Sequence, residues 1–249
     1  MFRKVWIMVL AVIVFLPIVT IAEQKKVVIS GTDWEPYTGA NLPENGFFTE
    51  IAVKSLEKTG YNVEVKIVPW KRALETTKLG TSSDGLLGAS FTEERTQFFH
   101  YPKYYWESAS HFFMKRGKQK IFTTIEALCP ASVGILAGSF YEERFKKIEC
   151  IKLDPAPAVN LNIRKLIGGR FDYLLESKDS VNYIIKKEFP NEIDSIQPLF
   201  PPYEVDRIFL VFSKKNPNYQ QISDDFDKGV KIIQDAGIYE EILKKHGIH

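Results

Sequence analysis

The sequence predicts an α/β fold with largely parallel sheets, and three observations lead to this prediction. Short apolar segments typical of strands alternate along the chain with longer segments whose apolar residues recur at helical spacing. Gly60 and Gly80 stand where two helices would end, and Pro69 stands where one would begin. The length of 249 residues is enough for two medium domains and a substantial core.

The N-terminal half has its strands and helices in alternation. The alternating side chains of Val63, Val65 and Ile67 are typical of a strand, whereas Phe48, Ile51 and Ala52 recur at helical spacing. The predicted elements, in order, are a strand at 27–30, a helix at 48–56, a strand at 63–67, a helix from 69 to 80, a strand at 86–90 and a strand at 108–115.

The strand at 108–115 is long enough to leave one domain and enter a second, after which the pattern restarts. Tyr219, Ile222 and Phe226 begin an apolar helical face near the C-terminus. The predicted elements are a short helix at 123–128, a strand at 131–136, a helix at 141–147, a strand at 151–153, a helix at 159–167, a strand at 172–175, a helix at 181–187, a strand at 208–212 and a helix at 219–233.

The first 22 residues have the pattern of a secretory signal peptide. Arg3 and Lys4 precede an uncharged apolar run, and Ala22 ends a small-residue cleavage site. The alternative is an uncleaved N-terminal anchor, which Pro17 disfavours. We therefore expect an exported, periplasmic protein that begins at Glu23.

Composition argues against two classes of function. Cleavage after residue 22 removes Arg3 and Lys4 from the 33 basic residues and none of the 31 acidic ones, so the remaining chain is formally neutral. Nucleic-acid binding therefore has little electrostatic support. The four histidines form no metal-binding pattern with each other or with the cysteines, and no metal or other cofactor is expected.

Cys129 and Cys150 are the two cysteines of the chain. In an oxidising compartment such a pair is more often bridged than free. They flank a predicted strand-helix unit that could return Cys150 close to Cys129. We expect a disulfide, with two buried thiols as the alternative.

The stretch from Gly88 to Arg95 is the main candidate for ligand binding. Ser90 and Thr92 point the same way on an extended chain, and a helical start at Glu93 would bring Arg95 back over them. Two hydroxyls and a guanidinium at one point suit a carboxylate. The alternative is a strand followed by a capping threonine and a surface arginine.

Aromatic and basic residues also follow two of the predicted strands. Trp34 and Tyr37 lie after the first strand, where ligands of α/β sheets collect, although both could equally pack in the core. Trp70 is open to the same two interpretations. Arg72 lies near a helix N-terminus, where the helix dipole disfavours a cation, so we expect a compensating anion beside it.

The order of several motifs resembles the periplasmic solute-binding proteins of polar-amino-acid ABC importers, and the resemblance covers essentially the whole chain after residue 22. Pro69-Trp70-Lys71-Arg72 marks a branch of that family. The other motifs are the signal peptide, Glu35-Pro36-Tyr37, Gly46-Phe47, Gly88 to Arg95, Gly138-Ser139, Gly169-Arg170-Phe171-Asp172 and Gly237 to Lys244.

The resemblance implies two α/β lobes joined by a two-strand hinge and closing over a small ligand. Lobe 1 would comprise residues 23–106 and 208–249, and lobe 2 residues 107–207. The partners that the resemblance implies are a small solute and an inner-membrane ABC permease, and we expect a monomer without catalytic activity.

The resemblance also implies ligand-binding roles. Arg95 would hold the ligand carboxylate beside Gly88, Ser90 and Thr92, and Trp34 would cover the ligand. The second lobe would contribute the start of a helix at Gly138, Ser139 and Phe140.

One position departs from the family. Relatives that bind α-amino acids carry an aspartate where this chain has Ser177, and that aspartate holds the ligand ammonium. Glu176 is adjacent and Asp179 follows, but an adjacent residue on a strand points to the opposite face. Either a nearby acid substitutes, or the ligand is a carboxylate or another small polar molecule without that ammonium.

Two other functions remain open at the level of the sequence. An enzyme such as a dehydratase can use this fold, with Glu35 and Glu176 as an acid and base pair if the fold brings them together. A periplasmic sensor partner would bind the solute and signal through a separate membrane protein.

Overall fold

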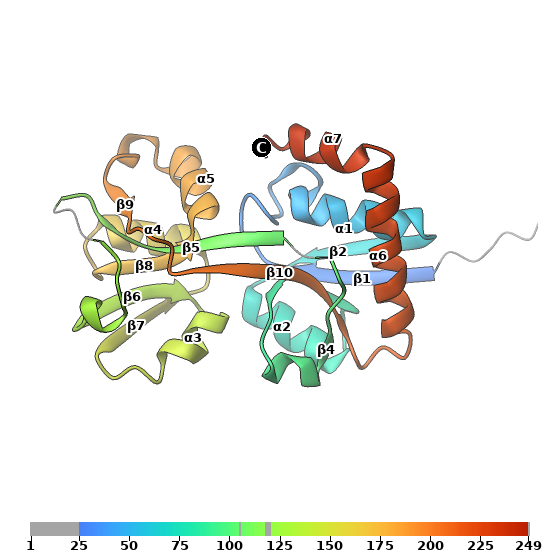
Figure 1. Cartoon of the computed structure of the whole chain (residues 1–249), viewed down its shortest axis with the longest axis horizontal. Coiled ribbons are helices and arrows are strands. Elements are labelled where there is room, and N and C mark those ends of the chain that lie inside the picture. The colour runs from blue at the N-terminus through green and yellow to red at the C-terminus, as the bar shows by residue number, and fades with distance from the viewer. Residues whose placement is uncertain (1–24, 105, 118–120, 249) are drawn as a thin grey trace, which may run out of the picture.

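The structure is a computed structural model that describes residues 25–104, 106–117 and 121–248. The predicted signal peptide at 1–22 lies outside these residues. The described strands form one sheet in the order β2-β1-β3-β10-β5-β8-β6-β7, with β4 added beside β10 and β9 beside β5. The sheet and its helices form two lobes, which Figure 1 shows side by side.

The first lobe is built on three parallel strands, with β1 between β2 and β3. Helix α6 packs along α1, and the C-terminal α7 lies beside both. The elements of this lobe are β1 (Lys25–Gly31), α1 (Phe47–Lys58), β2 (Tyr61–Ile67), α2 (Trp70–Leu79), β3 (Gly85–Ser90), β4 (Phe99–His100), α6 (Tyr219–Asp235) and α7 (Ile238–Lys245).

The second lobe has the same kind of core, in which β6 lies between the parallel strands β7 and β8. Helices α4 and α5 pack together over the sheet. Its elements are β6 (Ala131–Leu136), α3 (Phe140–Phe145), β7 (Ile151–Ala156), α4 (Val159–Ile167), β8 (Tyr173–Ser177), α5 (Lys178–Glu188) and β9 (Ile196–Pro198).

Two long strands connect the lobes. Strand β5 (Trp106–Lys115) leads from the first lobe into the second, and β10 (Glu204–Ser213) returns antiparallel to it. The register pairs Ser108 with Asp206 and Ser110 with Glu204. In Figure 1 these two strands run through the middle of the molecule from one lobe to the other.

Each lobe has its own apolar core. The largest core group of the first lobe packs α1 and α6 against the sheet through side chains such as Phe48 and Phe226. In the second lobe, Phe112 and Phe145 belong to one core group and Ile163 to another. Two separate cores allow the lobes to move as bodies about the crossing strands.

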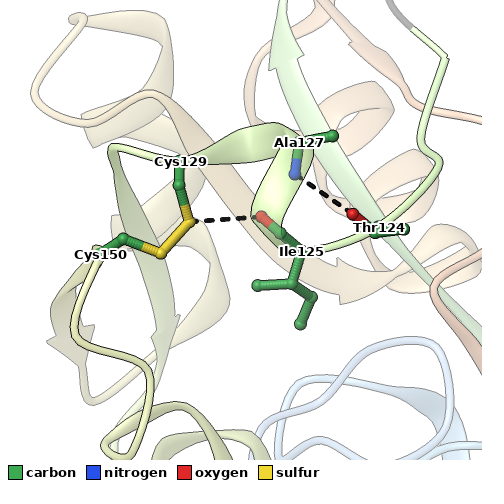
Figure 2. The surroundings of a disulfide bond; sticks show 5 residues. All are labelled: Thr124, Ile125, Ala127, Cys129 and Cys150. Carbon is green, nitrogen blue, oxygen red and sulfur yellow. Dashed lines mark hydrogen bonds between the residues drawn. A yellow bond between two sulfur atoms is a disulfide. The ribbon is translucent and has the colours of Figure 1, made fainter.

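The disulfide predicted between Cys129 and Cys150 is present. Figure 2 shows Cys129 directly after a short 3₁₀ turn, Glu126–Leu128, in which the backbone N–H of Ala127 donates to Thr124 Oγ1 at 3.2 Å. Cys150 immediately precedes β7. The bridge therefore joins the entrance of β6 to the entrance of its neighbour β7.

The predicted α/β fold with two lobes is confirmed, with differences of detail. The parallel strands of each lobe are joined by the antiparallel pairings of β5 and β10, so the sheet is mixed. The helix expected at 123–128 is only the 3₁₀ turn Glu126–Leu128. The lobe boundaries at 106 and 208 stay a prediction. None of the helices in the described ranges is long and apolar enough to cross a membrane.

Candidate functional site

A cavity lies between the lobes at the carboxyl ends of β3, β6 and β8. It encloses about 70 Å³, several times the space that one water molecule needs. Ligands of α/β sheets collect at such strand ends. The lining residues are Thr32, Trp34, Thr38, Trp70, Leu87, Gly88, Ser90, Arg95, Ser108, Ser110, Leu136, Ser139, Phe140, Tyr141, Leu175, Glu176, Asp206 and Ile208.

Gly88 forms a bulge in β3 at the cavity wall. The pairing with β10 skips it, because Phe209 faces Ala89 and Leu210 faces Leu87. Its φ of 77° lies in the left-handed region that favours glycine. A Cβ at this position would lie 3.4 Å from the Trp34 ring, an ordinary van der Waals contact, so the backbone conformation and not the space is what favours glycine here.

Arg95 turns back over the end of β3, as the sequence predicted for this stretch. Its Nη1 donates to the carbonyl oxygen of Ser90 at 3.2 Å, and its backbone N–H donates to Thr92 Oγ1 at 3.1 Å. Burial lowers the pKa of the Arg95 guanidinium. In the described parts of the chain, the arginines paired with carboxylates are Arg116, Arg144 and Arg170. The Arg95 cation therefore lines the cavity with no carboxylate of the described residues within 4.0 Å.

Two tryptophans of the first lobe line the cavity and bond to the second lobe. Trp34 Nε1 donates to Glu176 Oε1 at 2.9 Å, and Trp70 Nε1 donates to the carbonyl oxygen of Gly138 at 2.9 Å. The Arg95 guanidinium carbon lies 5.8 Å from the centre of the Trp70 ring. The indoles thus form aromatic walls and hold the lobes together around the cavity.

Glu176 is the buried acid of the cavity, with 8% of its surface exposed. Its Oε1 accepts from Trp34 and from the backbone N–H of Ser177 at 2.8 Å. Burial raises the pKa of the Glu176 carboxyl to about 7, although both hydrogen bonds act to lower it. Its Oε2 has no hydrogen-bond donor among the described residues and is available to a ligand.

Asp206 on β10 places a second carboxylate at the cavity. It accepts a hydrogen bond from the hydroxyl of Tyr141, which also lines the cavity. Burial raises the pKa of Asp206, against the hydrogen bond from Tyr141 and the charge of Arg144. The cavity thus combines one unpaired guanidinium with two acids and several serine and threonine hydroxyls.

Four of the residues predicted to bind ligand lie outside the cavity lining. Tyr37 is buried, and its hydroxyl is 2.9 Å from Ser177 Oγ and 3.1 Å from Asp179 Oδ2. Arg72 is exposed on α2. Thr92 and Gly138 line a neighbouring groove. Thr92 accepts from the Arg95 N–H, which is the capping role that the sequence left open.

Ser139 and Phe140 line the cavity at the start of α3, but several backbone N–H groups there already have acceptors. The Gly138 N–H donates to Glu142 Oε2 at 2.5 Å, and the Ser139 N–H donates to the Leu136 carbonyl at 3.1 Å. The Glu142 N–H bonds back to Ser139. These amides are therefore engaged within the helix start instead of open to a ligand.

Glu176, and not Ser177, faces the cavity at the end of β8. Ser177 caps α5 by accepting from the Ser180 N–H at 3.5 Å and also bonds to Tyr37. Glu35 is paired with Lys187 at 2.8 Å and is absent from the cavity lining. The acid and base pair of Glu35 and Glu176, considered as an enzymatic alternative, is therefore not assembled in this cavity.

Sequence reasoning missed Asp206, Tyr141, Ser108 and Ser110. Ser108 and Ser110 are two residues apart on β5 and share one face of the strand, and Asp206 is the register partner of Ser108. The pairing of two strands almost a hundred residues apart brings Asp206 to Ser108 and Ser110, and Tyr141 joins them from α3 through its hydrogen bond to Asp206. The sequence did offer one signal for these residues, because polar side chains stand beside apolar segments on both crossing strands, β5 and β10. No group of three or more potential metal ligands occurs within the described ranges.

Comparison with known proteins agrees with this architecture. Residues 27–249 match the family of bacterial extracellular solute-binding proteins, family 3. The chain is 24% identical over 232 residues to the arginine-binding extracellular protein ArtP of Bacillus subtilis (strain 168), covering 89% of this chain and 86% of ArtP.

Two solved structures share the fold. One is a histidine kinase sensor domain with similarity to periplasmic binding proteins, at a TM-score of 0.77 and 20% identity over 89% of this chain and 96% of that chain. The other is the arginine-, lysine-, histidine-binding protein ArtJ from Geobacillus stearothermophilus, at a TM-score of 0.71 and 22% identity over 89% and 94%. This chain belongs to the bacterial extracellular solute-binding proteins, family 3.

Proposed function

We propose that this protein binds a small polar or carboxylate-bearing solute, similar to an amino acid, between its lobes and delivers it to an inner-membrane ABC permease. The observation that carries the proposal is Arg95, whose guanidinium lines the cavity without a carboxylate partner among the described residues. A partly buried cation without a carboxylate partner is costly, and a ligand carboxylate would reduce that cost through two parallel hydrogen bonds.

The remaining contacts follow from the cavity lining. Gly88 and Ser90 would surround the carboxylate, and Trp34 and Trp70 would cover the ligand from two sides. Glu176 Oε2 offers an acceptor to an ammonium or another donor on the ligand. In this role Glu176 would take the place of the aspartate that amino-acid-binding relatives carry at the position of Ser177. The similarity to the arginine-binding protein ArtP supports an amino-acid-like ligand.

Binding would proceed by closure of the lobes about β5 and β10. Because the ligand contacts both lobes, it binds the closed arrangement more tightly and shifts the population toward it. The protein would act as a monomer in the periplasm, after cleavage of its signal peptide. The extracellular family assignment supports this location.

A thermal-stability screen with matched pairs of compounds tests the proposal. Each amino acid is compared with the amine that lacks its carboxylate, for example L-arginine with agmatine and L-lysine with cadaverine. At a hundredfold excess over Kd, a true ligand stabilises the folded protein by about 2.7 kcal/mol. We expect stabilisation by a carboxylate compound and none by its matched amine; equal stabilisation by both would reject the carboxylate clamp.

Recovery of the solute separates binding from catalysis. Mass spectrometry after prolonged incubation should return the bound compound unchanged, whereas turnover would establish an enzyme. Loss of solute uptake in a deletion strain would support delivery to a permease.

A sensor partner is the second candidate, because the sensor domain of a histidine kinase shares this fold. In that case the deletion strain would keep uptake and lose a transcriptional response to the solute.

A further inference from the structure

Residues 33–38, which we call the latch segment, join the two lobes outside the ligand cavity. The segment follows β1 in the first lobe, and it contacts α5 of the second lobe through Glu35 and Tyr37. Figure 1 shows α5 on the side of the second lobe that faces the first. Because Glu35, Tyr37 and their partners on α5 are absent from the cavity lining, these contacts form without a solute.

The latch segment is fixed to the first lobe by its own hydrogen bonds. The Trp34 N–H donates to the Thr38 carbonyl oxygen at 2.9 Å, and the Tyr37 N–H donates to the Trp34 carbonyl oxygen at 3.0 Å. The N–H of Phe48 on α1 donates to the Tyr37 carbonyl oxygen at 3.1 Å. The Tyr37 ring stacks on the Trp34 ring, with centroids 4.3 Å apart. Glu35 and Tyr37 are therefore carried by the first lobe.

The hydroxyl of Tyr37 contacts the start of α5 in the second lobe. It donates to Asp179 Oδ2 at 3.1 Å and lies 2.9 Å from Ser177 Oγ. It also lies 3.2 Å from Ser108 Oγ on β5. When the hydroxyl donates to Asp179, its oxygen can accept from both serines. Separation of the lobes would break the two bonds to the second lobe.

An ion pair between Glu35 and Lys187 is the second contact. Lys187 Nζ lies 2.8 Å from Glu35 Oε1 and 3.0 Å from Oε2, so it bridges both carboxylate oxygens. It also lies 5.6 Å from the centre of the Tyr183 ring, one turn earlier on α5, so the lysine side chain runs back along its helix. Among the described residues, Lys187 is the basic side chain within 4.0 Å of Glu35.

The two contacts lie toward opposite ends of α5. Asp179 is in the first turn and Lys187 in the last, and this separation corresponds to about 12 Å along the helix axis. Two contacts this far apart resist both separation and twisting of the lobes. The bond from Trp70 to Gly138 at the start of α3 adds a further connection between the lobes.

We propose that Glu35, Tyr37 and Lys187 are positioning residues for solute binding, which hold the lobes together before a solute arrives and do not touch the solute. The arrangement that they favour is the one in which Arg95 and Glu176 line a single cavity. A solute that finds the cavity already formed loses less of its binding free energy to ordering the protein.

The latch segment thereby sets the affinity for every solute by one common factor. The apparent affinity is the affinity for the closed arrangement multiplied by the fraction of the protein that is closed. The latch residues change only that fraction. This consequence rests on the proposed function, whereas closure of the solute-free protein does not.

Small-angle X-ray scattering of the solute-free protein tests the latch directly. Unfolding in urea without a reductant, followed by dialysis, removes bound solute and keeps the disulfide between Cys129 and Cys150. The radius of gyration of the parent protein should match that of the lobe arrangement described above. The variant carrying Tyr37→Phe and Lys187→Gln should have a larger radius, because its equilibrium shifts toward the open arrangement by about tenfold. Equal radii for the two proteins would overturn the proposal.

Lys165→Gln is the matched control, because Lys165 pairs with Asp154 at 2.8 Å within the second lobe. It should keep the radius of the parent protein. Lys187→Glu should enlarge the radius, because it places two acids together, and the added exchange Glu35→Lys should restore it. A radius that stays enlarged after the exchange, in a protein with unchanged circular dichroism, would show that the ion pair does not hold the lobes.

Calorimetry with two solutes from the thermal-stability screen tests the positioning role. The Tyr37→Phe, Lys187→Gln variant should bind both more weakly by the same factor, no greater than about tenfold, so the ratio of the two affinities stays constant. A changed ratio would mean that these residues contact the solute. Since the scattering experiment uses neither a solute nor an Arg95 variant, its failure is distinct from failure of the proposed function.

Discussion

Arg95 is partly buried and Glu176 is almost fully buried, and burial affects their opposite charges differently within one cavity. Burial disfavours the ionised form of each, so it lowers the pKa of the Arg95 guanidinium and raises that of the Glu176 carboxyl. An arginine stays charged even so. Glu176, with a pKa of about 7, changes its charge near neutral pH.

The stability of the ligand-free protein should therefore depend on Glu176 in a defined pH range. The native carboxyl has a pKa of about 7 and the reference value is 4.5. Between these values the native state holds a proton that the unfolded state has lost, so the free energy of unfolding falls as pH rises. Below the range both states are protonated, and above it both are ionised. The loss is at most about 3 kcal/mol.

Glu176→Gln is the matched variant, because its amide keeps an oxygen for Trp34 and cannot titrate. Urea unfolding between about pH 4 and about pH 8 should show the parent protein losing stability relative to the variant as pH rises. Identical pH profiles for the two proteins would show that Glu176 is not the titrating group.

Binding of a cationic ligand group should follow the opposite trend with pH. An ammonium needs the ionised form of Glu176, so the affinity of the parent protein for such a ligand should rise as pH increases through about 7. Calorimetry across this range checks the trend with L-arginine as the first probe. A pH-independent affinity in the parent protein would argue against an ionic contact at Glu176.

At the scale of elements, the close contact of α6 with α1 depends on one glycine. A Cβ on Gly229 would lie 2.0 Å from the backbone oxygen of Ser55. The helices would have to separate, since neither atom belongs to a flexible side chain. The alanine gains some helix propensity, but overpacking is the larger effect.

Gly229→Ala should therefore destabilise the protein by about 2 kcal/mol in thermal or urea unfolding. Gly117→Ala is the control, because a Cβ there meets no atom of the described residues within 4 Å and its φ is not positive. A stability of Gly229→Ala equal to that of the control would mean that the contact between α1 and α6 is looser than described.

Many elements could be predicted because their signals are local. The strand at 131–136 and the helix at 159–167 agree with the structure to the residue, and Gly80 does end α2 in the left-handed conformation. The short helix expected at 123–128 was overpredicted, since a segment this short has little hydrogen bonding of its own to hold a full helix.

The site was only partly predictable from the sequence, because only some of its contacts join residues close together in the chain. Arg95 reaches Ser90 five residues away, a local arrangement that the sequence indicates. Asp206 joins the cavity only because β10 pairs with β5, and Tyr37 turns toward Ser177 because of a contact across the lobes. Whether such a side chain lies in the core or lines the cavity depends on contacts between residues far apart in the chain. A local sequence pattern holds no information on those contacts.

At the scale of the whole molecule, the disulfide stabilises the second lobe. It closes a loop between residues separated by 21 positions, which contributes about 3 kcal/mol in the chain-entropy model. Replacing both cysteines by serine should lower the free energy of unfolding by about this amount, measured in urea against the oxidised parent protein. A decrease of less than about 1 kcal/mol in the free energy of unfolding would show that the disulfide adds little to the stability of the folded lobe.

The lobes form one binding unit only if a ligand joins them, and Arg95 is the group on which that claim depends. The most direct measurement is calorimetric titration of the carboxylate compound that gives the largest stabilisation, into the parent protein, Arg95→Ala and Arg72→Ala. Loss of two charge-assisted hydrogen bonds predicts that Arg95→Ala binds about a hundredfold more weakly or worse. Its circular dichroism should be unchanged, and Arg72→Ala, altered at an exposed position outside the cavity, should keep its affinity. Unaltered affinity in a folded Arg95→Ala protein would contradict the account.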